Sequence, residues 1–338
     1  MSNAILFGGV SLEHEISIIS AFQVKSFFED IYMIYFDKNF NIYDASKMTL
    51  DDFKKCKLSK LKPIYFCKNG FKSRFNKKNI ECAIILIHGQ NGEDGALKGM
   101  LDLYDISSVG CDMFNSSLFM NKYLSHKALS CSGYLVSDCY LLNKKDFVFA
   151  NYKNNYPCIV KPNCGGSSIG VVVCYNEPDF VKNVIDIFKY SDEVIVEEYL
   201  EDCEEYNVAV AEKYVSNVFK VKSKGEIFSF SDKYEQELKL NNELIDNELS
   251  NKLIDISKKV YLDFKLTGIV RVDFLVKEDK IYICELNTIP GSLSSYMFSN
   301  FNDVLMYQIS KAKLYNYKKK QHKDCFKSNL LNINKFSK

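Results

Sequence analysis

The sequence predicts an α/β (α+β) fold made of three packed units, and two observations support this. The 338 residues exceed what one small core accommodates, and 47% hydrophobic with 26% charged residues is typical of a globular chain. Strand and helix patterns alternate over the first hundred residues, which favours a parallel sheet, whereas strand pairs dominate later. We expect units over residues 1–110, 111–196 and 197–338, with a Lys-rich tail from about residue 315.

In the first unit, short apolar runs alternate with amphipathic segments. Strands are expected over 4–7, 31–36 and 82–87, and helices after Ser11 and over 95–104. Ser11 is of a type that caps helix starts, and Glu13 and Glu15 would lie in the first turn. Because loops of a parallel sheet gather at the carboxyl ends of its strands, we expect Glu13, His88 and Glu93 at one edge.

The two later units are expected to be rich in strands, with a helix in each part and no internal repeat. Strand patterns occur over 157–162, 171–174, 194–196, 206–211, 218–221, 268–276 and 280–287. Helical spacing occurs over 116–130, 179–190 and 247–264, and a last helix can reach about Leu314. A polar loop runs from Ser223 to about Glu237.

The composition excludes several classes of function. A formal net charge of +1 gives no indication of a nucleic acid or a charged membrane surface as partner. No run approaches the roughly 18 apolar residues of a spanning helix, and no signal-peptide layout opens the chain, so we expect a cytoplasmic protein. The twelve cysteines contain no C-x-x-C pair and the four histidines no metal-ligand spacing, which indicates neither a zinc site nor a disulfide framework.

The most informative segment is the predicted antiparallel strand pair near the C-terminus. Side chains alternate along a strand, so Arg271 and Asp273 share one face, and Glu285 and Asn287 share another. Pairing of the strands can merge these faces. Two carboxylates and an amide oxygen are hard ligands that suit Mg²⁺ held against nucleotide phosphates. An ordinary ion-pair cluster on a sheet face is the alternative.

A Gly/Ser-rich hairpin over residues 161–170 links two predicted strands. Its glycines would let backbone N–H groups approach phosphate oxygens, Ser167 and Ser168 add donors, and Lys161 supplies positive charge. A plain flexible turn is the alternative. The sequence contains no G-x-x-x-x-G-K-[ST], which excludes a Walker-type loop, and Gly8-Gly9 lacks the G-x-G-x-x-G dinucleotide pattern.

Other polar positions are individually ambiguous. The run Glu197-Glu198-Tyr199-Leu200, followed by Glu205, could form a hinge that reads adenine and ribose, or a solvated acidic turn. His88 could contact substrate or be a satisfied structural group, and Lys122 by itself resembles a surface lysine. Tyr234 could belong to a lid, although loops often carry such a tyrosine by chance.

Taken together, the motifs resemble those of the D-alanine–D-alanine ligases, which are members of the ATP-grasp superfamily. The resemblance extends over about residues 4 to 300, and only the conjunction of the motifs is specific. The matching segments, in order, are residues 8–17, 88–95, 120–122, 161–170, 197–200, 271–274 and 285–291.

The resemblance implies an ATP-grasp fold with the nucleotide between the central and C-terminal units. In this family, ATP phosphorylates the carboxylate of one D-alanine, and the amine of a second attacks the acyl phosphate to give the dipeptide used in peptidoglycan. Asp273, Glu285 and Asn287 would hold two Mg²⁺ ions, for which Mn²⁺ could substitute, while Lys122 and Lys161 contact the phosphates. No membrane or nucleic-acid partner is implied, and we expect a homodimer.

The resemblance also assigns roles around the reacting atoms. Arg271 and the backbone N–H of Gly291 would stabilise the oxyanion of the tetrahedral intermediate. Glu13 would hold the ammonium of the first D-alanine and join Ser167 and Tyr234 in a hydrogen-bonded triad, under a lid that excludes water.

Three positions depart from the family pattern. The serine that commonly binds the second substrate is replaced by Tyr296, so Ser294 or Ser295 would have to substitute. Phe230 stands where the lid often has a second tyrosine. The spacing from Glu198 to Glu205 fits the family, whereas that from Glu197 to Glu205 is one residue longer, which leaves open which glutamate reads adenine.

Other functions remain as alternatives. A D-alanine–D-lactate ligase is disfavoured by Tyr234, which lactate-selective relatives generally lack. Another ATP-grasp carboxylate–amine ligase is more distant, and a non-catalytic nucleotide-binding protein is disfavoured because all three metal-ligand positions are retained. Cys164, in the hairpin, is expected to be exposed when the site is empty, with Lys161 favouring its thiolate. The alternative is that Cys164 packs beneath the hairpin and is inert.

Overall fold

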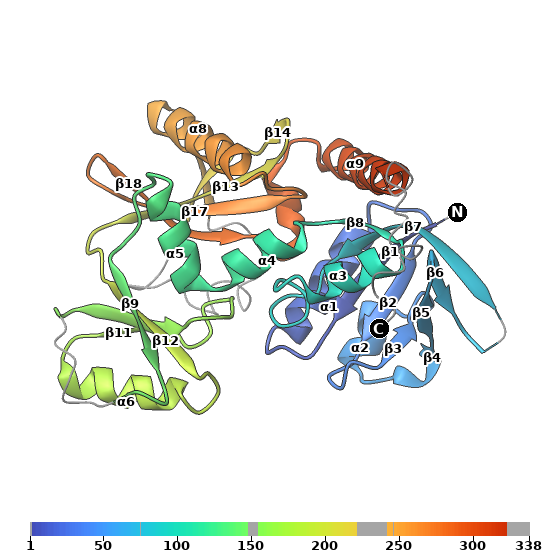
Figure 1. The fold of residues 1–338 in the computed structure, drawn as a ribbon, viewed down its shortest axis with the longest axis horizontal. Coiled ribbons are helices and arrows are strands. Elements are labelled where there is room, and N and C mark those ends of the chain that lie inside the picture. The colour runs from blue at the N-terminus through green and yellow to red at the C-terminus, as the bar shows by residue number, and fades with distance from the viewer. Residues whose placement is uncertain (1, 75, 148–154, 222–241, 246, 323–338) are drawn as a thin grey trace, which may run out of the picture.

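The computed structural model describes residues 2–74, 76–147, 155–221, 242–245 and 247–322. These residues form a mixed α/β architecture around three β-sheets (Figure 1). Each sheet is accompanied by its own hydrophobic cluster, and the α/β class predicted from the sequence is confirmed. The unit boundaries expected near residues 110 and 196 stay a prediction.

The first sheet has a parallel centre and antiparallel edges. Its order is β4-β3-β2-β1-β7-β6-β5, and β8 also pairs with β7. The pairs β1–β2, β1–β7 and β7–β8 are parallel, as the alternating pattern predicts. The strands are β1 (Ser2–Gly8), β2 (Tyr32–Phe36), β3 (Ile42–Asp44), β4 (Lys62–Pro63), β5 (Tyr65–Cys67), β6 (Gly70–Lys72), β7 (Lys77–Ile85) and β8 (Ser107–Val109). The short edge strands β3 to β6 were not predicted, because their few residues carry no clear alternation.

Four helical segments accompany this sheet along the chain: α1 (His14–Lys25), α2 (Leu50–Lys54), a 3₁₀ turn (Leu58–Lys60) and α3 (Ala96–Leu103). The expectation that Ser11 caps α1 is wrong. The cap position belongs to Glu13, whose side chain makes no capping bond. Ser11 Oγ instead donates to His88 O at 2.7 Å and accepts from Glu13 N at 3.2 Å, which ties the two loops together.

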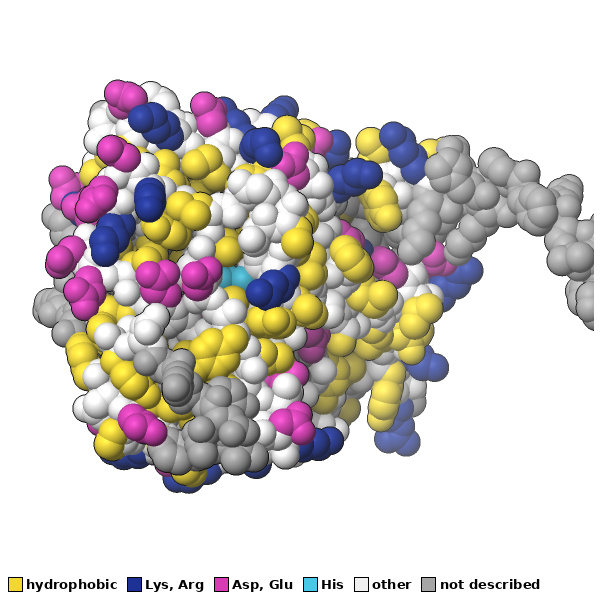
Figure 2. Space-filling model, turned by 60° about the vertical axis from the view of Figure 1, so that its left-hand side comes forward, with side chains coloured by type: hydrophobic (Ala, Val, Ile, Leu, Met, Phe, Trp, Pro, Cys, Tyr) yellow, Lys and Arg dark blue, Asp and Glu magenta, His cyan; other side chains and the backbone are white. Residues whose placement is uncertain are grey.

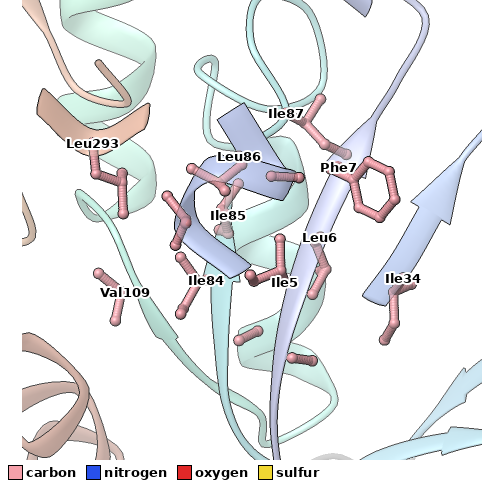
Figure 3. Packing of buried hydrophobic residues seen from close by; sticks show 14 of the residues in the cluster. Ile5, Leu6, Phe7, Ile34, Ile84, Ile85, Leu86, Ile87, Val109 and Leu293 are labelled. Carbon is pink, nitrogen blue, oxygen red and sulfur yellow. The ribbon is translucent and has the colours of Figure 1, made fainter. Parts of the chain in front are cut away.

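The core of the first sheet is built from the apolar runs of β1 and β7. Ile5, Leu6 and Phe7 pack beside the side chains of β7 and the loop after it (Figure 3). Leu293, far along the chain, points into the same cluster. Leu293 thereby anchors the polar turn after β18 to the core of the first sheet.

The second sheet is smaller and antiparallel, in the order β11-β10-β12-β9. Helix α6 (Glu177–Ile187) begins at Asn176, which accepts from Asp179 N, and its apolar stripe packs on the sheet (Figure 1). The strands are β9 (Cys139–Asn143), β10 (Cys158–Pro162), β11 (Val172–Cys174) and β12 (Glu193–Glu198). The Gly/Ser-rich segment joins β10 to β11, as predicted.

The third sheet contains the strand pair that the sequence singled out. Its order is β16-β15-β13-β17-β18, with β14 paired to β13. The strands are β13 (Glu204–Ala211), β14 (Tyr214–Val215), β15 (Val218–Val221), β16 (Asn242–Ile245), β17 (Val270–Lys277) and β18 (Lys280–Asn287), and α8 (Glu248–Asp263) packs against them. The predicted antiparallel pairing is confirmed, with Arg271 opposite Asn287 and Asp273 opposite Glu285.

The single helix expected over 116–130 is two helices, α4 (Met113–Met120) and α5 (Lys122–Cys131). The break is at Asn121, whose backbone is extended and whose side chain accepts from Leu124 N at 2.9 Å. An asparagine can replace the backbone bonds lost at such a break, so the apolar periodicity continues although the helix does not. Lys122 thereby becomes the first residue of α5.

The last helix, α9 (Phe301–His322), returns to the first sheet and lies beside β8 and β7 (Figure 1). Asn316 Nδ2 donates to Asp105 O and Ser107 Oγ, each at 3.2 Å. The helix therefore extends beyond the expected end near Leu314, since lysine-rich sequence is compatible with a helix. Residues 323–338 of the predicted tail lie outside the described residues.

Acidic and basic side chains are mixed over the face seen in Figure 2, as a net charge of +1 suggests. Among the described residues, no helix combines the length and apolar character needed to cross a membrane.

Candidate active site

A cavity of about 560 Å³ is lined by residues of the second and third sheets and of the hairpin between β10 and β11. All eight residues that the sequence assigned to nucleotide binding line it: Lys122, Lys161, Ser168, Glu197, Glu198, Tyr199, Leu200 and Glu205. Asp273 and Glu285 line it too. Ile159, Leu275 and Cys284 add an apolar part. The cavity thus combines a charged end with an apolar one.

At the charged end, the predicted metal ligands lie on the paired strands β17 and β18, where Asp273 is opposite Glu285 and is hydrogen-bonded to Asn287. Arg271 donates to both oxygens of Asp273, at 2.6 and 2.7 Å, and Asn287 Nδ2 donates to Asp273 Oδ2 at 2.9 Å. On β18, Glu285 Oε1 accepts a hydrogen bond from Nζ of Lys122, the first residue of α5, at 2.5 Å. The pairing of β17 with β18 therefore brings the polar side chains of the two strands together on one face, as expected.

These side chains have the chemistry of a magnesium site. Asp273, Glu285 and Asn287 offer two carboxylates and an amide oxygen, which are hard ligands, and the first two face the cavity. Among the described residues, no three His, Cys, Asp or Glu side chains are grouped for a metal. The donor set fits Mg²⁺ whose remaining ligands come from phosphate or water.

Lys122 is positioned by contacts between the start of α5 and the end of β10. Its backbone N–H donates to Asn163 O at 2.9 Å, and the Asn163 side chain accepts from Tyr123 N at 2.9 Å. Its Nζ also donates to Gly165 O at 2.8 Å. A lysine that appeared to be a surface group in the sequence is therefore buried and joined to the hairpin.

Lys161, on β10, pairs with Glu197 on β12. Its Nζ lies 2.8 Å from Oε2 of Glu197, and both side chains are buried. Burial lowers the pKa of Lys161, but Glu197 and the more distant Cys284 and Glu285 outweigh it and raise that pKa, so the lysine is charged. The buried His126, which the sequence did not single out, lies 3.3 Å from the other oxygen of Glu197.

The acidic run at the end of β12 divides into inward and outward residues. Glu197 and Leu200 are buried, whereas Glu198 is exposed at the cavity edge. Glu205 is half-buried and lines the cavity from β13. The reading of this run as only a solvated acidic turn does not hold for Glu197.

The tip of the hairpin reaches the first unit. Ser167 Oγ donates to Glu13 Oε1, and a Cβ on Gly166 would lie 3.0 Å from the same carboxylate, so a side chain there would crowd it. Ser167 and Ser168 have φ of 54° and 56°, a left-handed conformation uncommon for such residues. Burial, reinforced by Glu93, raises the pKa of Glu13 despite the Ser167 hydrogen bond.

Next to Glu13, hydrogen bonds join α1, the His88 loop and the turn after β18. His88 Nε2 lies 3.3 Å from Ser20 Oγ, which accepts from Ser292 N at 3.1 Å. His88 Nδ1 lies 3.7 Å from Glu93 Oε1. Burial lowers the pKa of His88, but Glu93 and then Glu13 raise it above its ordinary value. We call Glu13, Ser20, His88, Glu93, Ser167 and Ser292 the substrate cluster.

The turn Gly291–Met297 closes one side of this cluster. Ser292, Leu293 and Ser294 have φ between 50° and 54°, which is costly for residues with a Cβ. Burial of Leu293 in the first core helps to hold this conformation. Ser294 is fully buried, and its Oγ has no hydrogen-bond partner among the described residues.

The replacement of the usual serine by Tyr296 leaves different groups near the turn. Tyr296 is exposed and contacts the Phe219 ring, with centroids 6.2 Å apart. Ser295 is half-buried. Tyr234 and Phe230 lie outside the described residues, so their predicted lid roles stay predictions.

Cys164 is exposed in the hairpin, as expected, but the predicted thiolate character is wrong. Although the residue as a whole is exposed, surrounding protein atoms shield the thiol from part of the solvent, and this raises the pKa of Cys164. Lys122, rather than Lys161, is the cation that lowers it. Lys161 is directed to Glu197 and so cannot stabilise a thiolate there.

Comparisons with known proteins show which family the chain resembles. The N-terminal model of the D-ala D-ala ligase family matches residues 2–111, and the C-terminal model matches residues 131–325. A D-alanine–D-alanine ligase of Helicobacter acinonychis is 36% identical over 320 residues, covering 89% of this chain and 91% of the relative.

Solved structures give the same result. The D-alanine–D-alanine ligase of Helicobacter pylori has a TM-score of 0.79 at 34% identity, covering 92% of this chain and 98% of that one. The VanG D-Ala:D-Ser ligase of Enterococcus faecalis has a TM-score of 0.77 at 26% identity, covering 92% and 100%. The chain therefore belongs to the D-alanine–D-alanine ligase family and has its ATP-grasp fold.

Proposed function

We propose that the protein uses ATP and Mg²⁺ to join two D-alanine molecules into D-alanyl-D-alanine for peptidoglycan synthesis. The observation that carries this proposal is the hydrogen bond from Ser167 to Glu13. It brings the hairpin that lines the nucleotide cavity to the cluster that would hold the first amino acid. Phosphoryl transfer requires this proximity, because the carboxylate of the substrate must meet the γ-phosphate in line.

The nucleotide base would occupy the apolar part of the cavity between Ile159, Leu200 and Leu275. Glu197 is the glutamate that we assign to the adenine end, because it is directed inwards, while Glu198 is exposed. Glu205, on β13, would face the ribose hydroxyl groups. The Tyr199 backbone would complete the hinge around the base.

At the phosphate end, Lys122, Lys161 and the hairpin with Ser168 would contact the oxygens. When bound, Mg²⁺ would neutralise the charge that develops on the transferred group, with Asp273, Glu285 and Asn287 as its protein ligands. Each lysine is currently paired with a carboxylate, at 2.5 and 2.8 Å. Phosphates and Mg²⁺ would therefore exchange partners with existing ion pairs, and each carboxylate that a lysine leaves would need a new counter-charge.

Glu13 would bind the ammonium of the first D-alanine, and His88 would lie beside its carboxylate. Attack by a second D-alanine creates an oxyanion, which Arg271 and the Gly291 N–H would stabilise. A Cβ added at Gly291 would meet nothing within 4 Å, so the space on the side-chain side of its Cα is open. Exclusion of water protects the acyl phosphate, the role that we assign to the Tyr234 loop.

The second substrate would bind near Ser294 and Ser295. The buried, unpartnered hydroxyl of Ser294 favours it as a contact for the acceptor carboxylate. A D-lactate acceptor is the second candidate; the VanG relative is a D-Ala:D-Ser ligase, so acceptor choice varies in the family. The expected homodimer also stays a prediction, which sedimentation analysis would test.

Phosphate release and product identification test the proposed function. Purified protein with ATP and Mg²⁺ is supplied in turn with D-alanine, L-alanine, and D-alanine plus D-lactate or D-serine. We expect D-alanine-dependent phosphate release with one dipeptide per phosphate, and little effect of L-alanine. Absence of dipeptide would reject the assignment, and a depsipeptide as the main product would favour the D-lactate alternative.

A further inference from the structure

The imidazole of His126, on α5 beside the nucleotide cavity, lies between two hydrogen-bond acceptors. Its Nδ1 is 3.3 Å from Ser137 O, and its Nε2 is 3.3 Å from Glu197 Oε1. Among the described residues, neither Nε2 nor this carboxylate oxygen has a hydrogen-bond partner, although both are buried. A neutral imidazole has one N–H and cannot donate to both acceptors, whereas an imidazolium can.

The surroundings of His126, burial above all, disfavour this second proton in the nucleotide-free protein. Glu197 faces it from β12, Lys161 from β10 and Lys122 from its own helix. Burial lowers the pKa of His126, and the two lysines add to this effect, against the opposing effect of Glu197. Glu197 is meanwhile neutralised through its other oxygen by Lys161, at 2.8 Å.

Nucleotide binding would change this balance of charge. Lys161 lines the cavity, and its ammonium would move towards the phosphates, leaving Glu197 as a buried carboxylate with a weaker counter-charge. His126 is already within reach of the unpartnered oxygen of Glu197. A proton on Nε2 would restore both the charge balance and the missing hydrogen bond.

We propose that His126 is a positioning residue that takes up a proton from solvent when nucleotide phosphates draw Lys161 away from Glu197. The imidazolium then donates to Ser137 O and Glu197 Oε1 and holds Glu197 in place. This inference rests on the proposed nucleotide site. It implies that nucleotide affinity rises as pH falls, by up to about tenfold per pH unit between the pKa of His126 in the free protein and that in the complex.

Calorimetric titration tests the proton uptake. A non-hydrolysable ATP analogue with Mg²⁺ is titrated at one pH in two buffers of different ionisation enthalpy. We expect uptake of roughly one proton per nucleotide in the unmodified protein, and its loss in His126→Gln. The matched control is His14→Gln, because His14 is also buried but contacts Gly9 O and Tyr35 Oη, not a carboxylate. Equal uptake in His126→Gln would overturn the inference.

Nitrogen-15 spectra of histidine side chains decide the question even if His126→Gln does not fold. In the unmodified protein, the His126 nitrogens should change from neutral to imidazolium shifts when the analogue and Mg²⁺ are added. A neutral His126 in the saturated complex would contradict the inference. Failure of the protein to bind the analogue at all would instead reject the proposed nucleotide site, so the two failures are distinguishable.

Discussion

The nucleotide cavity and the substrate cluster differ in how their charged side chains are compensated before any ligand binds. In the cavity, Lys161 and Lys122 are each paired with a carboxylate, so binding exchanges partners within an already neutralised site. In the substrate cluster, burial and the neighbouring carboxylate of Glu93 disfavour the charged form of Glu13, against the Ser167 hydroxyl and the positive charges of His88 and Lys122. The ammonium of an amino acid would add to this positive charge and stabilise the carboxylate.

The difference indicates that the two regions select ligands by different physical means. The cavity would bind a polyanion by turning its lysines from carboxylates to phosphates, with Mg²⁺ and a protonated His126 compensating the carboxylates that the lysines leave. The substrate cluster is held by hydrogen bonds between segments distant in the sequence and by a left-handed turn anchored through Leu293. Such a preorganised site would favour ligands of one shape and charge. Four variants test this difference between the cavity and the substrate cluster.

The largest effect is expected for Glu285→Gln. This change removes the negative charge of a proposed metal ligand, which is also the partner of Lys122. Because metal stabilisation of phosphoryl transfer is worth several kcal/mol, kcat should fall on the order of a thousandfold or more. Dipeptide synthesis measures it, with Glu212→Gln, in a surface pair with Lys311, as control. Unchanged kcat would remove Glu285 from the metal site.

Lys161→Met should affect both stability and nucleotide binding. It leaves Glu197 buried without its partner, which typically costs about 3–5 kcal/mol. The ATP KM should rise, while the D-alanine KM should change little. Adding Glu197→Gln should recover part of the unfolding free energy but not the ATP affinity, as measured by urea unfolding and steady-state kinetics. Full recovery of both would show that Lys161 has only a structural role.

Ser167→Ala tests the substrate side. It removes the hydrogen bond to the Glu13 carboxylate, and bonds to charged groups are worth about 1.5–3 kcal/mol. We expect kcat/KM for D-alanine to fall roughly 10–100-fold, with nucleotide affinity nearly unchanged. Cys164→Ala, at an exposed neighbour, is the control. A larger effect on ATP than on D-alanine would mean that the hairpin tip belongs to the nucleotide cavity.

The smallest effect concerns pH. His88 has a folded-state pKa above its ordinary 6.5, since Glu93 and Glu13 outweigh burial. The native state therefore binds this proton more tightly than the unfolded state, and its stabilising contribution is present below pH 6.5 and lost as pH rises through the folded-state pKa. In His88→Gln, the decline in melting temperature over this window should shrink by about 1–3 °C. An unaltered pH profile would show that Glu93 and Glu13 do not stabilise a protonated His88.

Much of the third sheet could be predicted because its signals are local. Alternation along two strands joined by a charged turn places Arg271, Asp273, Glu285 and Asn287 on one face, and this arrangement is observed. The Gly/Ser hairpin between β10 and β11 also follows from short-range patterns, whereas the strand expected over 82–87 runs from Lys77 to Ile85. These features depend on residues only a few positions apart.

Features that depend on distant contacts could not be predicted. Nothing in its neighbourhood distinguishes Lys122 from a surface lysine, and its burial depends on Asn163 in another element. His126 is linked to the nucleotide cavity only because the folded chain places Glu197 of β12 beside it. The assignment of a helix cap to Ser11 was wrong because the hydroxyl finds a better acceptor in the His88 loop. Tertiary contacts override local preference at these positions.

The substrate cluster would present the carboxylate of a bound D-alanine to the phosphate end of the cavity. Oxygen transfer tests it most directly: D-alanine labelled with ¹⁸O in its carboxylate is incubated with ATP, Mg²⁺ and the protein, and the products are analysed by mass spectrometry. Phosphorylation of the carboxylate followed by amine attack moves one ¹⁸O into inorganic phosphate, with ADP as the other product. Unlabelled phosphate, or label in AMP, would contradict the account.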